Sequence, residues 1–404
     1  MPVFAGSLRD FQVQGRRRKK EQEMDLGLSW EAEEFRRHVA RFVQERLAPI
    51  AEDLDKTGEP PLDLVREMGG LGFLGVKFPE EYGGAGVDQP NTYHCILVEE
   101  LAKVSAGFSA TVAMTTSVPL LSVYHFGSED LKQKYLVPAL RGEKIAAFAL
   151  TEPGAGSDAA AVRTRAVRDG DSYVLNGTKI FISNGTIADF ITVVAKTESD
   201  TGKKGMSIFL VDTAMKGFRV GKRLSKFTTH CSDTAELVFE DLVVPKDHLL
   251  GEENTGLLGI MPHLEADRIM TGATSLGLAK AAYEAALQYS KEREQFGRPI
   301  SKFQAVRFRL AEMLALLESS ELYLYYAAAK ADRGEKVSKE AALTKIIVCE
   351  AANKICSMAL SIFGGYGLMT EYPVERFLRD SYFPLIGGGT PDIMRVVVAR
   401  EIGI

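Results

Sequence analysis

The sequence has few of the residues from which disulfide frameworks and structural metal sites are built. It contains four cysteines in 404 residues, at positions 95, 231, 349 and 356, and none of them forms a CxxC pair. The six histidines do not complete a zinc-ligand spacing with them either. We therefore expect a reducing compartment and no bound metal.

Long apolar runs and an excess of basic residues are also missing. No apolar run approaches the roughly 20 residues of a membrane-spanning helix. Lys and Arg together number 49 against 54 for Asp and Glu, which gives a net charge of −5. Because nucleic-acid-binding proteins usually carry a basic face, this balance argues mildly against that class. Internal repeats and low-complexity linkers are absent as well.

The most basic segment is GRRRKK, residues 15–20, which precedes the first amphipathic stretch. Residues 1–23 have no sustained periodicity, so we interpret them as a disordered tail. An organelle presequence or an incorrectly assigned start would give the same pattern. We accordingly expect a cytoplasmic protein, or one of the mitochondrial matrix if the tail is a presequence.

Periodicity divides the remaining chain into three parts. Apolar residues recur at three- and four-residue spacing over 24–148, which predicts an α-helical domain. Over 149–255 short alternating runs are separated by Asp169-Gly170, Asn176-Gly177 and Asn184-Gly185, which are turn signals, so a β-barrel or sandwich is expected. Helical spacing returns over 256–404 in three long segments and a fourth that begins near Thr390, as in a four-helix bundle. The predicted fold is mainly α with a central β domain.

Three glycines, Gly387 to Gly389, precede the last predicted helix in the stretch PLIGGGTPDIMR. Thr390 suits the N-cap, and Pro391 suits the first helical position. A glycine run before a helix N-terminus leaves backbone N–H groups open to an anion or a carbonyl oxygen. A tight turn would use the same residues.

The stretch FALTEPGAGSDAAA, residues 148–161, contains the GxGxxA pattern of dinucleotide-binding loops. The residues after it alternate like a strand and do not open a helix, so a Rossmann fold is a poor interpretation. The small residues of this loop would still let a phosphate or a ring edge approach the backbone.

This stretch, together with GGYGLMTEYPVERFLRD at 364–380, resembles the two signatures of the acyl-CoA dehydrogenases. The resemblance extends over nearly the whole chain from Met24 and includes the order of the three domains. It implies bound FAD between the β domain and the bundle, an acyl-CoA substrate, an electron-transferring flavoprotein as acceptor, and a dimer of dimers. The residues that it assigns to FAD are Phe148, Leu150, Thr151, Gly156, Ser157, Phe181, Ser183, Arg293, Gln304, Ser361, Ile362, Gly364, Gly365, Thr390 and Asp392. Arg293 and Gln304 would reach the adenine half of an FAD on a neighbouring subunit.

The reaction implied by this resemblance needs a carboxylate that removes the α-proton of the thioester. Many family members have a Glu immediately before the Gly-Thr of the last loop, and here that position is Gly388. Other members, among them the isovaleryl and long-chain types, place the carboxylate on an earlier helix before an Arg, which corresponds to Asp267 and Arg268. We therefore predict Asp267 as the catalytic base. The resemblance further places Ser157, Glu265, Arg268, Gly388 and Gly389 against the substrate.

Two alternatives for Asp267 are a structural ion pair with Arg268 or a neighbouring helix, and replacement by Glu265 as the base. Glu265 is disfavoured because two positions along a helix correspond to a rotation of about 200°. Glycine at 387 and 388 also suggests room for a branched or alicyclic acyl group. At the level of the whole protein, a flavin oxidase or monooxygenase and a catalytically silent acyl-CoA-binding subunit are the competing hypotheses.

Overall fold

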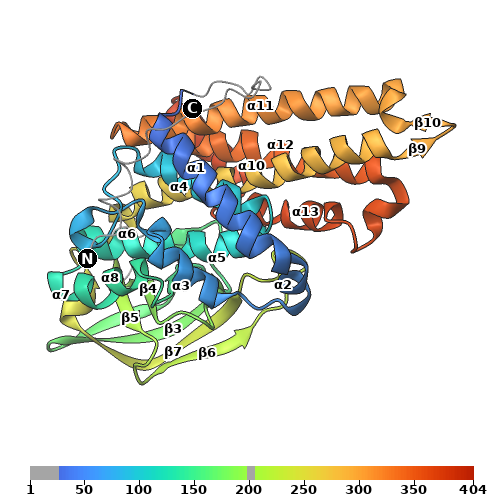
Figure 1. Cartoon of the computed structure of the whole chain (residues 1–404). Helices are drawn as coiled ribbons and strands as arrows, with labels where there is room; N and C mark the ends of the chain where they lie inside the picture. The colour runs from blue at the N-terminus through green and yellow to red at the C-terminus, as the bar shows by residue number, and fades with distance from the viewer. Residues whose placement is uncertain (1–26, 198–204) are drawn as a thin grey trace.

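A computed structural model describes residues 27–197 and 205–404. The basic segment 1–23 lies outside the described residues. In Figure 1 strands β3 to β7 lie together at the bottom, helices α10, α11 and α12 run side by side across the top, and the β9–β10 hairpin lies at the right-hand end of these helices. The helices of the N-terminal part lie between these two layers.

The N-terminal part is helical, as its periodicity predicts. Ser29 accepts a hydrogen bond from the Ala32 N–H at 3.2 Å, Ser105 accepts one from the Phe108 N–H at 3.2 Å, and Ser128 accepts one from the Leu131 N–H at 3.3 Å, so three of its described helices have side-chain N-caps. The helices are α1 (Trp30–Phe42), α2 (Ala51–Thr57), α3 (Leu62–Gly70), α4 (Pro90–Ala102), α5 (Ala106–Thr116), α6 (Val118–Phe126), α7 (Glu129–Leu131) and α8 (Val137–Leu140).

The middle part is a single sheet of eight strands in the order β6-β7-β3-β2-β4-β5-β8, with β1 added in parallel to β4. Asp169-Gly170 forms the predicted turn between β2 and β3. Asn176-Gly177 does not form a turn: β3 continues through it, with a register shift against β7 between Leu175 and Gly177. The strands are β1 (Ala146–Ala149), β2 (Arg165–Asp169), β3 (Ser172–Ser183), β4 (Phe190–Lys196), β5 (Met206–Asp212), β6 (Phe218–Arg223), β7 (Thr234–Pro245) and β8 (Leu249–Leu250).

The C-terminal part is built around three long helices, α10 (Met261–Glu292), α11 (Gln304–Asp332) and α12 (Ser338–Phe363). The fourth helix of the predicted bundle, α15 (Pro391–Glu401), is much shorter and packs on α12. Its N-cap is Thr390, as predicted, and its first residue is the predicted Pro391. The connecting elements are α9 (Gly256–Gly259), the hairpin β9 (Glu294–Gln295) and β10 (Arg298–Pro299), α13 (Val374–Asp380) and α14 (Phe383–Ile386).

Helix α10 connects the bundle to the N-terminal part because it packs against both α12 and α4. Gly277 allows this close approach: a methyl group there would lie 2.3 Å from the main-chain oxygen of Glu99. Glu99 is buried and accepts a hydrogen bond from Lys280 at 2.7 Å. The α4–α10 contact therefore fixes the position of the helix that carries Asp267.

Two helical stretches among the described residues are long and apolar enough to cross a membrane, 106–126 and 338–368. The first spans α5 and α6 and is 94% buried, and half of the second is buried. Both contribute to the cores of the protein, where α12 packs on α10. Apolar composition at this level is common in the core helices of large domains.

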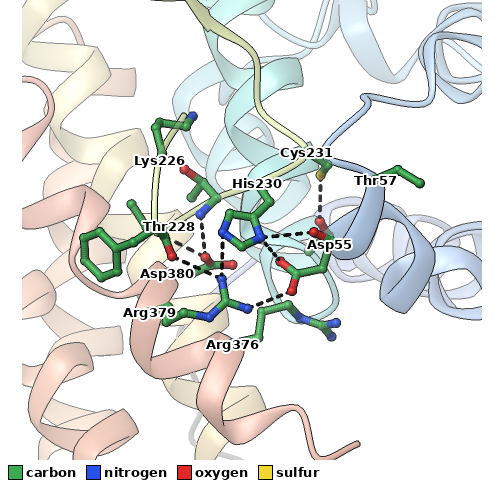
Figure 2. Close-up of polar contacts among 12 residues, drawn as sticks. Asp55, Thr57, Lys226, Thr228, His230, Cys231, Arg376, Arg379 and Asp380 are labelled. Carbon is green, nitrogen blue, oxygen red and sulfur yellow. Dashed lines mark hydrogen bonds and ion pairs between the residues drawn. The ribbon is translucent and has the colours of Figure 1, made fainter. Parts of the chain in front are cut away.

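A polar cluster joins the three parts of the chain at α13 (Figure 2). Arg379 donates to Asp55 of α2 at 2.7 Å and approaches His230 Nε2 at 3.3 Å. Asp380 is buried and accepts a hydrogen bond from the Thr229 N–H at 2.6 Å. The end of the second signature therefore contacts the helical domain and the β domain at once.

Candidate active site

Asp267 lies in the second turn of α10 and is half-buried. Its Oδ1 atom accepts a hydrogen bond from the Ser117 hydroxyl at 3.1 Å, at the junction between α5 and α6. Burial raises the pKa of the Asp267 carboxyl, and the Ser117 hydrogen bond and the charge of Lys345 oppose that rise. A carboxyl with these neighbours is suited to accept a proton.

The loop of Gly387, Gly388 and Gly389, called the glycine loop below, lies close to Asp267. Gly388 and Gly389 have φ angles of +68° and +103°, which glycine adopts without strain. A methyl group placed at Gly388 would lie 3.4 Å from Asp267 Oδ2 and 3.9 Å from the Thr271 hydroxyl. The carboxylate from α10 therefore lies beside the position where many family members carry their glutamate side chain.

The two neighbours of Asp267 along the helix have other contacts. Glu265 accepts a hydrogen bond from the Ser338 hydroxyl at the start of α12. Arg268 forms no ion pair with Asp267 in the described part of the chain, and its Nε atom is buried without a hydrogen-bond partner. Of the two carboxylates, the one that lies beside the glycine loop is Asp267.

The first signature forms a loop that is anchored through Glu152 and exposed to solvent at Gly156 and Ser157. Glu152 accepts hydrogen bonds from the Lys179 ammonium at 2.8 Å and from the Thr164 N–H at 2.9 Å, and Lys179 also donates to the Leu150 carbonyl at 2.8 Å. Gly156 and Ser157 are exposed, and a methyl group at Gly156 would have no neighbour within 4 Å. The backbone at Gly156 is therefore accessible to a ligand, while the Glu152–Lys179 pair holds the loop in place.

The apolar members of the same signature face inward. Phe148 and Leu150 are half-buried and pack against the core that α6 and α8 form with the sheet, and Thr151 is also half-buried. The Thr151 carbonyl accepts a hydrogen bond from the Ile180 N–H at 2.9 Å, which ties the loop to β3.

Phe181 lies in a second irregularity of β3, where the register against β7 shifts between Lys179 and Ile182. Its φ is +60° and its ring is 66% exposed, an unfavourable combination for an aromatic residue in a strand. Bulges of this kind re-aim side chains beside functional sites. Ser183, two residues on, is buried.

A hollow of about 550 Å³ opens at the end of the bundle near the β9–β10 hairpin. Its floor includes Tyr289 and Phe363, whose rings stack at 4.1 Å. Four residues predicted to hold FAD are brought together in its lining: Arg293, Ile362, Gly364 and Gly365.

The other predicted cofactor residues of the bundle lie outside this lining. Ser361 is exposed and its hydroxyl donates to the Ser357 carbonyl at 2.9 Å. Gln304 is the exposed first residue of α11. At the other end, Thr390 caps α15, and Asp392 is 93% exposed and pairs with Arg395 at 3.3 Å.

Four residues of the site were not found by sequence reasoning: Ser117, Lys345, Glu152 and Lys179. Ser117 and Asp267 are 150 residues apart in the chain, so no local pattern predicts their contact. Glu152 lies inside the first signature, and its buried pairing with Lys179 could only have been suspected from a lysine within a β-rich run.

Three family models match consecutive parts of the chain. They are described as the N-terminal domain of acyl-CoA dehydrogenase over residues 29–143, its middle domain over 147–242 and its C-terminal domain over 254–403.

Individual relatives agree with this assignment. The chain is 42% identical over 376 residues to the 3-(aryl)acrylate reductase of Clostridium sporogenes, covering 92% of this chain and 98% of that one. The structure of butyryl-CoA dehydrogenase from Megasphaera elsdenii superimposes with a TM-score of 0.91 at 39% identity, covering 94% of this chain and all of that one. A chain in a structure described as the electron transferring flavoprotein of Acidaminococcus fermentans gives a TM-score of 0.91 at 43% identity, with coverage of 94% and 100%. The chain therefore belongs to the acyl-CoA dehydrogenases, a family of flavin-dependent oxidoreductases.

Proposed function

We propose that this protein binds FAD and oxidises an acyl-CoA thioester to the 2-enoyl-CoA, with Asp267 as the base that removes the α-proton. The observation that carries this proposal is the distance of 3.4 Å between Asp267 Oδ2 and a Cβ position at Gly388. A base is defined by where its oxygens lie, so a carboxylate from α10 can replace one from the loop.

The residues fit a flavin nucleotide in two regions. The loop at Gly156 offers bare backbone to a pyrophosphate, and the exposed Phe181 ring offers a flat apolar face to an isoalloxazine. The hollow that contains Arg293, Gly364 and Gly365 suits a further part of an FAD, which by family resemblance belongs to a neighbouring subunit. Bound FAD would supply the acceptor for the β-hydrogen, which leaves as a hydride.

The protein's own groups would act on the α-carbon and the thioester carbonyl. Asp267 is held by Ser117 on one oxygen, which leaves Oδ2 directed toward the glycine loop. The Gly388 N–H makes no hydrogen bond among the described residues, so it is available to the thioester oxygen as negative charge develops there. Proton removal and charge stabilisation would thus come from two elements, α10 and the loop.

For the acyl group we propose a branched, alicyclic or aryl-bearing chain. Glycine at 387 and 388 leaves no side chain beside the α-carbon, and the relative from Clostridium sporogenes is named for an aryl substrate. For the electron acceptor we propose an electron-transferring flavoprotein, in line with the described subject of the structure from Acidaminococcus fermentans. The proposed assembly is a homotetramer.

The test is an anaerobic titration of the purified holoprotein with butyryl-, isovaleryl-, cyclohexanecarboxyl- and 3-phenylpropionyl-CoA, followed by flavin absorbance. Bleaching that is strongest with the last three supports the proposal, and preference for butyryl-CoA contradicts the acyl group proposed. Rapid aerobic turnover without a flavoprotein acceptor would favour an oxidase. Tight binding of every thioester without bleaching would favour a silent acyl-CoA-binding subunit.

A further inference from the structure

Lys345 is a buried lysine that contacts the glycine loop and has no role in the proposed reaction so far. It lies on α12, and its side chain is completely buried. Its ammonium donates hydrogen bonds to two main-chain carbonyls, those of Gly387 and Gly389. A lysine is rarely buried without a carboxylate partner, because desolvation of its charge is costly. Here that cost is offset by contacts to one loop of three residues.

These contacts determine the direction of the amide between them. In a trans peptide the C=O of one residue and the N–H of the next point to opposite sides of the same plane. No cis peptide occurs in the described chain. With the Gly387 carbonyl directed to Lys345, the Gly388 N–H must therefore point away from α12.

The loop has few other means of fixing that direction. Its three residues lack side chains, and glycine has more backbone freedom than any other residue. The Gly387 N–H caps α14 through the Phe383 carbonyl at 2.9 Å, whereas the Gly388 N–H has no partner among the described residues. Lys345 is thus the side chain that restrains the peptide plane between Gly387 and Gly388 and the plane that follows Gly389.

Lys345 and Asp267 also lie close to the same glycine. A methyl group at Gly388 would be 3.8 Å from Lys345 Cε and 3.4 Å from Asp267 Oδ2. The charged groups that face Asp267 are Lys345 from α12, Arg268 from its own helix and Lys77 from the N-terminal domain. Of the three, Lys345 acts most strongly on Asp267, and its positive charge favours the ionised carboxylate.

We propose that Lys345 is a positioning residue, which holds the Gly387–Gly389 loop so that the Gly388 N–H faces the thioester carbonyl and which places a positive charge beside Asp267. This inference rests on the proposed function. It adds a residue that touches neither the substrate nor the cofactor and acts through the loop and through the base.

The test compares Lys345→Met with the wild-type holoprotein. Methionine has a similar length and no donor or charge. The matched control is Lys226→Met, because Lys226 also donates to a main-chain carbonyl, that of Ser232 at 2.6 Å, but in the junction of Figure 2. Stopped-flow reduction by the thioester that bleaches the flavin best gives the reduction rate constant and the dissociation constant separately, from pH 5 to pH 9.

We expect Lys345→Met to lower the reduction rate constant by at least tenfold, up to the roughly 10²- to 10³-fold typical of losing an oxyanion donor. The dissociation constant should change less than threefold, and the acidic limb of the rate profile should move to higher pH. Lys226→Met should leave both parameters and the limb in place. An unchanged rate and limb in Lys345→Met would overturn the inference while leaving the proposed function intact.

Two further measurements keep the outcome decisive. If Lys345→Met does not fold, Lys345→Gln removes the charge but keeps an N–H donor, and an unshifted acidic limb in that variant contradicts the inference. An α-acidified thioester, 3-thiabutyryl-CoA, reports α-proton removal by its absorbance without turnover, and its ionisation should weaken in both variants. If none of the thioesters reduces the flavin of the wild-type protein, the proposed function fails, and this inference fails with it.

Discussion

Replacing Asp267 by Asn tests the proposed base without disturbing its surroundings. Asparagine has the same shape, and its carbonyl oxygen can still accept the 3.1 Å hydrogen bond from Ser117. The side chain loses its negative charge and, with it, its ability to take a proton. A positioned general base contributes about 10²- to 10⁴-fold to a rate, which corresponds to about 3 to 5 kcal/mol in the activation free energy.

The assay is single-turnover flavin reduction under anaerobic conditions, with substrate binding measured separately. We expect the reduction rate constant of Asp267→Asn to fall within that range and the dissociation constant to stay within a few-fold of wild type. A variant that still reduces its flavin at more than a fifth of the wild-type rate would refute the assignment of Asp267 as the base.

Moving the carboxylate back to the loop provides the complementary test. In Asp267→Ala/Gly388→Glu the new side chain starts 3.4 Å from where the old carboxylate lay. The φ of +68° at this position makes any side chain strained, by about 1 to 3 kcal/mol. We expect the double variant to be less stable than wild type but to reduce its flavin at least tenfold faster than Asp267→Ala alone.

Three further predictions concern two residues of the candidate site and one residue of the junction at α13. Ser117→Ala removes a hydrogen bond that lowers the pKa of Asp267, so the acidic limb of the flavin-reduction profile should move to higher pH. Phe181→Ala should weaken FAD retention in equilibrium dialysis, because it removes the exposed ring that offers an apolar face to the flavin. Burial raises the pKa of Asp380 to about 6, so its neutral form is favoured on folding. The stabilisation that Asp380 contributes to the free energy of unfolding is complete below its unfolded pKa near 4 and is lost as the pH rises through 6. Denaturant titrations at several pH values measure this loss. Asp380→Asn, which cannot ionise, should abolish about 3 kcal/mol of the pH dependence.

The sequence was most informative where function imposes a pattern on neighbouring residues. The Thr390 N-cap and Pro391 at the first helical position were predictable because capping depends on local chemistry. The prediction of a turn at Asn176-Gly177 was wrong, because β3 pairs with β7 on both sides of this dipeptide and accommodates it as a bulge. Pairing with a strand distant in the sequence cannot be predicted from local residues.

The same distinction separates the predicted and the missed parts of the site. Asp267 was predicted as the base from a family position, but its neighbours Ser117 and Lys345 lie at the α5–α6 junction and on α12, and their contacts depend on how these helices pack. Lys345 is separated from Gly387 by 42 residues and looks, in the sequence, like an ordinary lysine of an amphipathic helix. Buried polar groups that act across elements are therefore the features that single-sequence reasoning finds last.

The placement of the carboxylate on α10 has a physical consequence for the whole site. A base on a glycine-flanked loop moves with that loop, whereas Asp267 is fixed by a helix that packs on both α4 and α12. Aspartate also loses fewer side-chain degrees of freedom than glutamate would when it is held in one geometry. In the proposed mechanism the loop has only to present an N–H, and the contacts of the buried Lys345 with two loop carbonyls would orient it. In the proposed mechanism, rigidity of the base comes from α10 and alignment of the amide comes from α12, so that substitutions of Asp267 or Lys345 should change the rate of proton removal without a comparable change in thioester binding.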